Sequence, residues 1–517
     1  MPNAAPSPLT RQRSPLALIW PLLPLLVGLA VRLWLIQQNA GITMDSPLYW
    51  RMAQALRHGQ PALGPAHHGY PALIALASMF LHGAVVPGRA VSLLAAVALM
   101  LVVYALARRT LEPAWASLAV WLVALHPLLA VYGGVVMTES TVLALSYGAL
   151  LWMERERFFA GGVTMGFAYL VRPEALVLAP LGALCARGPM RKFLLVLAGV
   201  AIVMAPYVGY LRWERGSWMI SPKTVLVRPT LGKNQSAEWR VGPGGAPPPE
   251  ERIGFVQRLR WAAPSVAQNY GPGLLEHLGL LLRSWPWPLM LLSALGWAAW
   301  RRALLAPLLM ELGLPLLAVP FDPRFSLLAV PALAVFAARG ATWLTQLLAA
   351  RPRVRMAAAA AALALSGLGI FWMWQGPDGR TARNFDDGPM NEMRLAGEWL
   401  AAQGPPGARV MDRKAYVPFF AGMEHVQLPD DDYDTIIEFA QREGVKYLVL
   451  EEYVVRALRK QMRPLAEDPE FRAREKRLRL VYAHTSGPDE GVAVLEVLRD
   501  SVATDSLSRD GEKAPGP

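Results

Sequence analysis

Hydrophobic runs separated by short polar segments dominate the first 375 residues of the chain. A helix needs about 20 apolar residues to cross the hydrocarbon core of a bilayer, and most of these runs approach that length. The pattern therefore predicts an α-helical polytopic membrane protein with about eleven transmembrane helices. We place the spans at residues 15–37, 89–107, 113–132, 138–153, 159–171, 174–186, 193–211, 281–300, 303–320, 325–346 and 356–375. The fifth and sixth runs are too short to cross comfortably, so we expect a hairpin of half-depth helices inside the bundle.

Clusters of basic residues between the runs indicate the orientation of the chain. When the runs are threaded through a membrane, every cluster falls on the same side, as cytoplasmic loops do. The clusters are Arg11 with Arg13, Arg108-Arg109, Arg155 with Arg157, Arg187 with Arg191 and Lys192, Arg301-Arg302, and Arg351 with Arg353 and Arg355. We expect the N-terminus in the cytoplasm and the C-terminal part outside it, in a multi-pass protein of a bacterial plasma (inner) membrane.

Two segments between spans face outward on this threading. Residues 38–88 contain LYWRMAQALRHG and YPALIALASMFLHG, whose length and pattern suit helices that lie in the membrane interface. Residues 212–280 contain GPGGAPPPEE, which is typical of a mobile loop.

The pattern changes after residue 375. MRLAGEWLAAQG and YDTIIEFAQREG read as amphipathic helices that end at glycine, whereas ARVMDR, YLVLEEY and GVAVLEV read as strands, the last after a basic helical stretch. This alternation predicts a C-terminal extracytoplasmic α/β domain over residues 376–500. Residues 501–517 are polar and are expected to be a disordered tail. The membrane domain is thus predicted to span 1–375.

The composition agrees with a membrane protein. Only 17% of residues are charged and 54% are hydrophobic, against about 25% charged residues in soluble domains. The net charge of +12 does not indicate a nucleic-acid partner, because the basic residues are distributed as short clusters between apolar runs. The first run is longer than the core of a signal peptide, so no cleavable signal is expected. The single cysteine, Cys185, excludes an intramolecular disulfide.

Polar and charged side chains from several segments are predicted to meet at the outer side of the membrane. They are Asp45, His67, His68, Arg89, Glu139, Arg172, Glu174, Asp322 and Arg324. Charges beside hydrocarbon are costly, so a convergent set predicts a functional site. No Walker, GxGxxG or catalytic-serine pattern accompanies them, which argues against a nucleotide-using enzyme or a hydrolase.

Each of these residues has two interpretations. Asp45 is either the N-cap of a helix that opens at DSPLYW or a general base. Arg172 in YLVRPEAL and Arg324 in FDPRFSLLAVPAL either reach for the interface beside a local acid or grip a lipid-linked phosphate bidentately. Glu139 in VMTES either caps a helix or acts in the site.

The remaining basic groups divide in the same way. His67 and His68 could donate to a phosphate, while the absence of HxH or HExxH spacing makes a metal site a weak interpretation. Arg32 and Arg89 read most simply as interface anchors at span ends.

Together these features resemble the polytopic glycosyltransferases of the GT-C fold. The acid soon after the first span, the interfacial helices, RPEAL in a short hairpin and the late PRFSLLAVPAL are similar to glycosyltransferase family 39, the branch of protein O-mannosyltransferases and aminoarabinose transferases. The resemblance covers most of residues 15–375 and extends to an outer α/β tail. It implies a polyprenyl-phosphate sugar donor and an active site that faces away from the cytoplasm.

The resemblance also implies roles for residues. Asp45 would be the catalytic base and Glu139 a second carboxylate. Arg172, Arg324, His67, His68 and Arg89 would surround the donor phosphate. Some relatives use a divalent cation, Mg²⁺ or Mn²⁺, and the sequence does not decide whether this chain does; its metal ligands are unknown.

Two positions depart from the family pattern. Asp45 is followed by Ser46 where relatives often have Asp-Glu, and Arg324 is followed by Phe325 where they often have Arg-Tyr. We expect an integral membrane glycosyltransferase of the hexosyl- or pentosyltransferase class, acting in the cell envelope on a protein, lipid or glycan acceptor. A flippase of lipid-linked sugars or an inactive glycolipid-binding protein are the alternatives; the lack of an internal repeat argues against a transporter.

Overall fold

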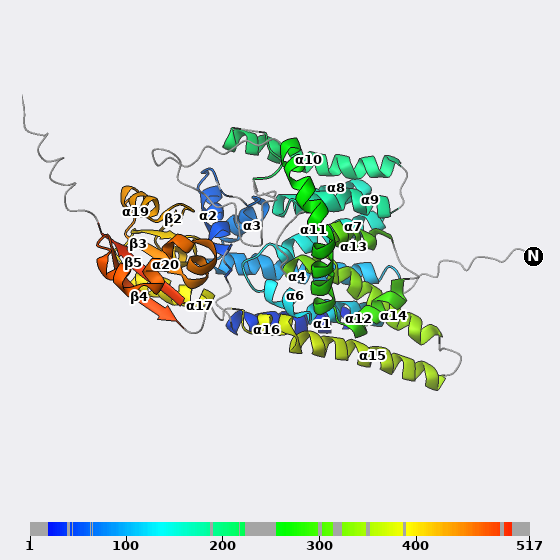
Figure 1. Cartoon of the computed structure of the whole chain (residues 1–517). Coiled ribbons are helices and arrows are strands. Elements are labelled where there is room, and N and C mark those ends of the chain that lie inside the picture. The colour runs from blue at the N-terminus through cyan, green and yellow to red at the C-terminus, as the bar shows by residue number, and fades with distance from the viewer. Residues whose placement is uncertain are drawn as a thin grey trace, which may run out of the picture. The chain divides into compact units, whose positions relative to one another are not determined.

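The structure is a computed structural model that describes residues 19–38, 42–43, 45–62, 64, 66–186, 190–216, 218–222, 255–297, 302–313, 323–347, 352–385, 389–485 and 491–498. Contacts divide the chain into two units, which Figure 1 shows in ribbon form. The helical unit comprises Met1–Gly41, Tyr49–Thr224 and Val266–Phe385. The second unit comprises Ile42–Leu48, Val225–Ser265 and Asp386–Pro517.

The helical unit is built from long and short helices. They are α1 (Ile19–Gln38), α2 (Ser46–Arg57), α3 (Gly69–Ala77), α4 (Val86–Ala107), α5 (Pro113–Ala124), α6 (Pro127–Tyr132), α7 (Glu139–Glu154), α8 (Phe158–Val171), α9 (Ala175–Cys185), α10 (Met190–Arg215), α11 (Phe255–Ser284), α12 (Trp287–Trp297), the 3-10 turn η3 (Arg302–Leu304), α13 (Leu305–Gly313), the 3-10 turn η5 (Pro323–Leu328), α14 (Val330–Leu347), α15 (Pro352–Gln375) and α16 (Pro377–Arg383). By the division above, α2 and α11 begin in the second unit.

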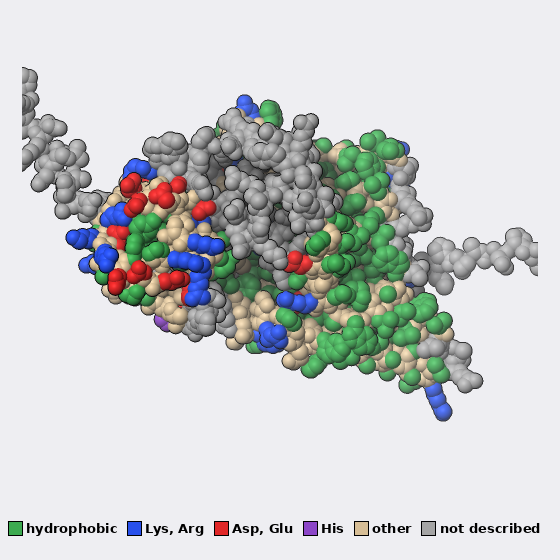
Figure 2. Space-filling view, viewed as in Figure 1, with side chains coloured by type: hydrophobic (Ala, Val, Ile, Leu, Met, Phe, Trp, Pro, Cys, Tyr) green, Lys and Arg blue, Asp and Glu red, His purple; other side chains and the backbone are tan. Residues whose placement is uncertain are grey.

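The membrane character of the helical unit is confirmed, while the number of spans stays a prediction. Within the described ranges, four helices are long and apolar enough to cross a bilayer: α1 from Trp20, α4, α10 and α15. The part of α11 from Tyr270 and α12 are apolar enough together, but the pair is bent by 100° between Ser284 and Trp287, as in a broken span or a re-entrant loop. Pro286 lies at this break. Proline has no backbone N–H to donate and its ring clashes with the preceding turn, so it interrupts a helix. Hydrophobic side chains cover most of the visible face of this unit (Figure 2).

Two predictions about the helical unit can be compared directly with the structure. The short hairpin is present as α8 and α9, joined through Arg172, and α8 packs tightly on α10: a Cβ at Gly162 would lie 2.2 Å from the Val196 carbonyl oxygen. The prediction that an outer loop extends to residue 280 is wrong for the second half of that loop, because α11 already begins at Phe255. The GPGGAPPPEE stretch and the tail 501–517 lie outside the described residues.

The C-terminal part of the second unit contains a small sheet with helices, while the predicted bounds 376–500 and the extracytoplasmic location of this domain stay predictions. A five-stranded sheet has the order β2-β1-β3-β5-β4, with β1 parallel to β2 and β3, and β5 antiparallel to β3 and β4. The strands are β1 (Arg409–Asp412), β2 (Glu424–Gln427), β3 (Tyr447–Glu451), β4 (Leu478–Thr485) and β5 (Gly491–Val497). The helices are α17 (Pro389–Gln403), α18 (Tyr416–Ala421), α19 (Tyr433–Arg442), the turns η6 (Val454–Leu458) and η7 (Lys460–Met462), α20 (Arg463–Glu467) and α21 (Pro469–Arg474).

The sequence missed the two edge strands of this sheet. β2 is only four residues long with one buried side chain, and β4 exposes most of its side chains. Neither strand shows the apolar alternation by which strands are recognised. The basic helical stretch does exist, but it ends at Arg474 and the chain continues into β4.

Candidate active site

A buried ion pair between Glu139 and Arg172 lies at the centre of the candidate site in the helical unit. Glu139 is the first residue of α7 and is 2% exposed, and Arg172 follows the last residue of α8. Arg172 Nη1 donates to Glu139 Oε1 over 3.0 Å. Arg172 Nε lies 3.5 Å from Glu174 Oε2. The hairpin therefore brings three of the predicted residues together.

The second predicted arginine joins this pair through an aromatic ring. The guanidinium carbon of Arg172 lies 5.7 Å from the centre of the Phe325 ring, and that of Arg324 lies 5.4 Å from the same centre. Arginine stacks well on aromatic faces while keeping its N–H groups available. Two cations from turns far apart in the sequence thus share one ring. Asp322, the predicted partner of Arg324, lies outside the described residues.

A polar network positions the start of α7 and hence Glu139. The Ser92 hydroxyl donates to the Met137 carbonyl over 3.1 Å and accepts from the Tyr70 hydroxyl over 2.7 Å, and the Tyr70 hydroxyl also lies 3.2 Å from the Gly88 carbonyl oxygen. These bonds connect α3, α4 and the residues before α7. Arg89 follows Gly88 on α4 and is half-buried.

His67 and His68 are buried in a separate aromatic cluster. His67 Nε2 forms a 2.8 Å hydrogen bond with Ser221 Oγ. His68 Nδ1 bonds the Tyr207 hydroxyl over 2.9 Å, and its Nε2 lies 3.3 Å from Glu214 Oε1. Burial lowers the pKa of His68 below its ordinary value, although Glu214 opposes this effect. These contacts tie the outer loop to α10, and a role of either histidine toward a phosphate stays a prediction.

Asp45 belongs to the second unit. It directly precedes α2, as the sequence predicted, and its side chain is 32% exposed. Its Oδ1 lies 3.3 Å from Nζ of Lys414, which follows β1 by two residues. Its backbone N–H donates to Thr43 Oγ1 over 3.3 Å. Lys414 carried no recognisable signal in the sequence.

The prediction that Arg32 anchors α1 at the interface is wrong. Arg32 is 1% exposed and donates to the carbonyls of Gly28, Ala124 and Leu129 over 2.9, 3.1 and 3.2 Å. Ala124 is the last residue of α5, where a carbonyl group has no partner within its helix and needs another donor. Arg32 donates to this carbonyl and to that of Leu129 in α6, and so joins α1 to the break between α5 and α6.

A divalent cation has no visible set of ligands in the described part of the chain. Nowhere among those residues do three histidine, cysteine, aspartate or glutamate side chains gather as metal ligands. Glu139 and Glu174, the carboxylates in the helical part of the site, both pair with Arg172. These residues do not fit a metal centre, and the predicted Mg²⁺ or Mn²⁺ remains untested.

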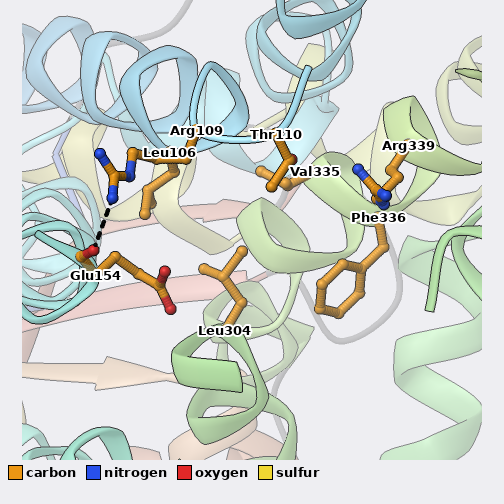
Figure 3. Close-up of a pocket in the computed structure, with 8 residues that line it drawn as sticks. All are labelled: Leu106, Arg109, Thr110, Glu154, Leu304, Val335, Phe336 and Arg339. Carbon is orange, nitrogen blue, oxygen red and sulfur yellow. Dashed lines mark hydrogen bonds between the residues drawn. The ribbon is translucent and has the colours of Figure 1, made fainter. Parts of the chain in front are cut away.

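A pocket lies at the other end of α7 (Figure 3). It is lined by Leu106, Arg109, Thr110, Glu154, Leu304, Val335, Phe336 and Arg339. Arg109 Nη2 donates to the Glu154 carbonyl over 3.1 Å, and Glu154 Oε1 accepts the Ala303 N–H over 3.3 Å. The pocket shares no residue with the predicted site.

Comparison with known proteins identifies the fold. No model of a known protein family matches the sequence, and a search of curated proteins finds no relative. Among solved structures, ArnT from Cupriavidus metallidurans bound to undecaprenyl phosphate is similar at a TM-score of 0.55 and 12% identity, over 92% of this chain and 98% of ArnT. An oligosaccharyltransferase from Archaeoglobus fulgidus in complex with Zn and sulfate has a TM-score of 0.54 and 13% identity, over 90% of this chain and 72% of its own.

A further structure of the archaeal enzyme extends the comparison. AglB from Archaeoglobus fulgidus, in complex with an inhibitory peptide and a dolichol-phosphate, has a TM-score of 0.51 and 14% identity over 85% of this chain and 70% of its own. At these identities the similarity establishes the fold. The chain thus has the GT-C fold of membrane glycosyltransferases, which confirms the resemblance seen in its sequence.

Proposed function

We propose that the chain is a glycosyltransferase that moves a sugar from a polyprenyl-phosphate donor to an extracytoplasmic acceptor. The observation that carries this proposal is the meeting of Arg172 and Arg324 on Phe325, beside the buried Glu139. A pair of guanidinium groups at one point is suited to a phosphate, which accepts bidentate hydrogen bonds. The undecaprenyl phosphate bound by ArnT, and the dolichol-phosphate and inhibitory peptide bound by AglB, suggest which lipid and acceptor chemistry to test first.

The reaction requires one bond to form and one to break. The acceptor hydroxyl or amine attacks the anomeric carbon and loses its proton to the Asp45 carboxylate. The bond from the anomeric carbon to the phosphate oxygen breaks, and its electron pair leaves with the polyprenyl phosphate. Arg172 and Arg324 stabilise the negative charge that develops on that phosphate.

Glu139 acts in this scheme by holding Arg172. Its burial and its 3.0 Å bond to the guanidinium fix the side chain before the donor arrives. Preorganised groups of this kind need no rearrangement during the reaction. Phe325 supplies a stacking face for both arginines where relatives often carry a tyrosine.

We place the enzyme in a bacterial plasma membrane, with the N-terminus in the cytoplasm and the second unit outside. The positive-inside distribution of the basic clusters supports this orientation. The charged surface of the second unit, visible in Figure 2, suits an aqueous compartment. The partners are then the lipid-linked donor, the bilayer and an extracytoplasmic acceptor.

The test is sugar transfer in membranes from cells that express the wild type or the Asp45→Asn variant. Cells are labelled with sugar precursors, and the polyprenyl-linked and acceptor-linked pools are compared. We expect loss of acceptor-linked sugar and accumulation of the polyprenyl-linked sugar. Asp430→Asn is the matched control, because Asp430 is also 32% exposed and paired with an arginine of the second unit. Unchanged pools in Asp45→Asn would refute its role as base, and sugar that crosses the membrane without transfer would indicate a flippase.

A further inference from the structure

A second buried ion pair lies in the helical unit, and none of the reactions above uses it. His277 on α11 is fully buried, and Glu311 on α13 is 2% exposed. His277 Nε2 forms a hydrogen bond with Glu311 Oε2. Ionisable groups inside a membrane bundle are costly and occur there mainly for function. We therefore expect the pair to have a function.

The other oxygen of Glu311 leads to the segment that carries Arg324. Glu311 Oε1 accepts the backbone N–H of Ala329 over 3.0 Å. Ala329 lies between η5, which contains Arg324 and Phe325, and the first residue of α14. The same N–H also donates to the Ser326 carbonyl over 3.3 Å, so Glu311 is the nearer of its two acceptors, and a carboxylate at the start of a helix also interacts favourably with the helix dipole.

Other contacts hold the same turn but carry no charge. The Tyr147 hydroxyl donates to the Leu328 carbonyl over 2.6 Å, and Ser326 Oγ donates to Ser284 Oγ over 3.4 Å. Glu311 is thus the carboxyl group in the set that fixes where η5 ends. His277 in turn holds Glu311, since a buried carboxylate needs a donor that satisfies it.

We propose that His277 and Glu311 are positioning residues for the donor phosphate. By anchoring Ala329 they fix η5 so that the Arg324 guanidinium stays on Phe325, next to Arg172. The proposal rests on the proposed function, in which Arg324 binds the donor phosphate. Neither residue touches the donor; both act through the backbone of the turn.

Binding of radiolabelled undecaprenyl phosphate to the full-length protein in nanodiscs tests the proposal. Loss of a charge-assisted hydrogen bond to phosphate corresponds to about a tenfold or larger loss of affinity, which we expect for Arg324→Gln. His277→Leu should weaken binding about tenfold through the misplaced turn. His277→Gln should restore most of the affinity, because its amide N–H can still donate to Glu311.

If a single His277 variant fails to fold, a double variant can still test the positioning role. Replacing a buried ion pair by apolar residues is often neutral for stability, so His277→Leu/Glu311→Leu is expected to fold. It nevertheless lacks the anchor on Ala329 and should bind the lipid about tenfold more weakly. Glu154→Gln is the control, since Glu154 also accepts a backbone N–H across helices, from Ala303 at the pocket of Figure 3. Its affinity should not change.

The outcomes separate the two proposals. Wild-type affinity in a folded double variant, combined with weak binding in Arg324→Gln, would overturn the positioning role and leave the proposed function intact. Wild-type affinity in Arg324→Gln would instead overturn the phosphate role of Arg324. A lower melting temperature with unchanged affinity in His277→Leu would show that the pair only stabilises the fold.

Discussion

The Glu139–Arg172 pair allows a quantitative test of the site in the helical unit. The side chains are 3% and 16% exposed, and their closest atoms are 3.0 Å apart. Removal of one partner from a buried ion pair costs about 3–5 kcal/mol, because the other charge stays buried without compensation. Arg172 also contacts Glu174 and Phe325, so Glu139→Gln should lie near the lower end of that range.

A double-mutant cycle isolates the energy of the pair. In Glu139→Gln/Arg172→Gln neither member of the pair carries a charge, and the two amides can bond one another. The double variant should therefore be less destabilised than the sum of the single variants by about 2 kcal/mol, within the range for residues in contact.

The single cysteine of the chain provides the readout. Cys185 is the last residue of α9, the second helix of the hairpin that carries Arg172, and it is partly buried. Its labelling by a maleimide at increasing denaturant concentration reports the opening of this hairpin rather than of the second unit. A protein that retains the pair should give the same labelling curve as the wild type. Single-variant effects that simply add up in the double variant would show that Glu139 and Arg172 are not energetically coupled.

Three other predictions concern separate parts of the chain. Asp45→Asn should reduce sugar transfer at least about a hundredfold, as expected for loss of a general base. The melting temperature should not fall, because asparagine caps a helix about as well as aspartate; unchanged transfer would indicate that Asp45 is only a helix cap. Gly340→Ala should destabilise the helical unit by about 1–3 kcal/mol, because its Cβ would lie 1.9 Å from the Leu292 carbonyl oxygen. Gly367→Ala is the control and should not destabilise it, since nothing lies within 4 Å of that Cβ. Chemical unfolding in detergent compares the two variants. Burial, and then the neighbouring Glu451, raise the pKa of Asp412 well above its ordinary value of 3.8. The folded second unit then retains a proton that the unfolded chain releases, so its stability should fall as the pH rises from about 4 toward the folded pKa, and Asp412→Asn should abolish this trend in a pH series of unfolding curves.

Much of the architecture could be predicted because partition into a bilayer depends mainly on composition along the chain. The predicted runs correspond to α1, α4, α10 and α15, and the meeting of Arg172 with Glu139 followed from placing span ends on one face. The strands β1, β3 and β5 were recognisable from apolar residues, since all three are largely buried.

The features that were missed depend on contacts between distant segments. Arg32 looks like an interface anchor because nothing near it in the sequence reveals that it donates hydrogen bonds to the carbonyls of Ala124 and Leu129, on either side of the α5–α6 break. Glu311 did carry a signal: it lies inside the predicted span 303–320, where a carboxylate should already indicate a function. Its partner His277 fell in a segment predicted to be a loop, so the pair could not be assembled from the sequence.

Two of the buried carboxylates of the helical unit, Glu139 and Glu311, have related tasks in this scheme. Glu139 bonds the side chain of Arg172 directly, whereas Glu311 bonds the backbone of the turn that carries Arg324. Because each carboxylate is almost fully buried and already bonded to its partner, neither is well placed to take a proton from an acceptor that arrives from water. Asp45 differs from both, since a third of its side chain is exposed and its partner Lys414 is itself 38% exposed. A surface ion pair of that kind is worth at most about 1 kcal/mol, so an incoming acceptor can displace Lys414 at little cost. The division of labour that follows assigns leaving-group binding to rigid, buried groups and proton transfer to an accessible one.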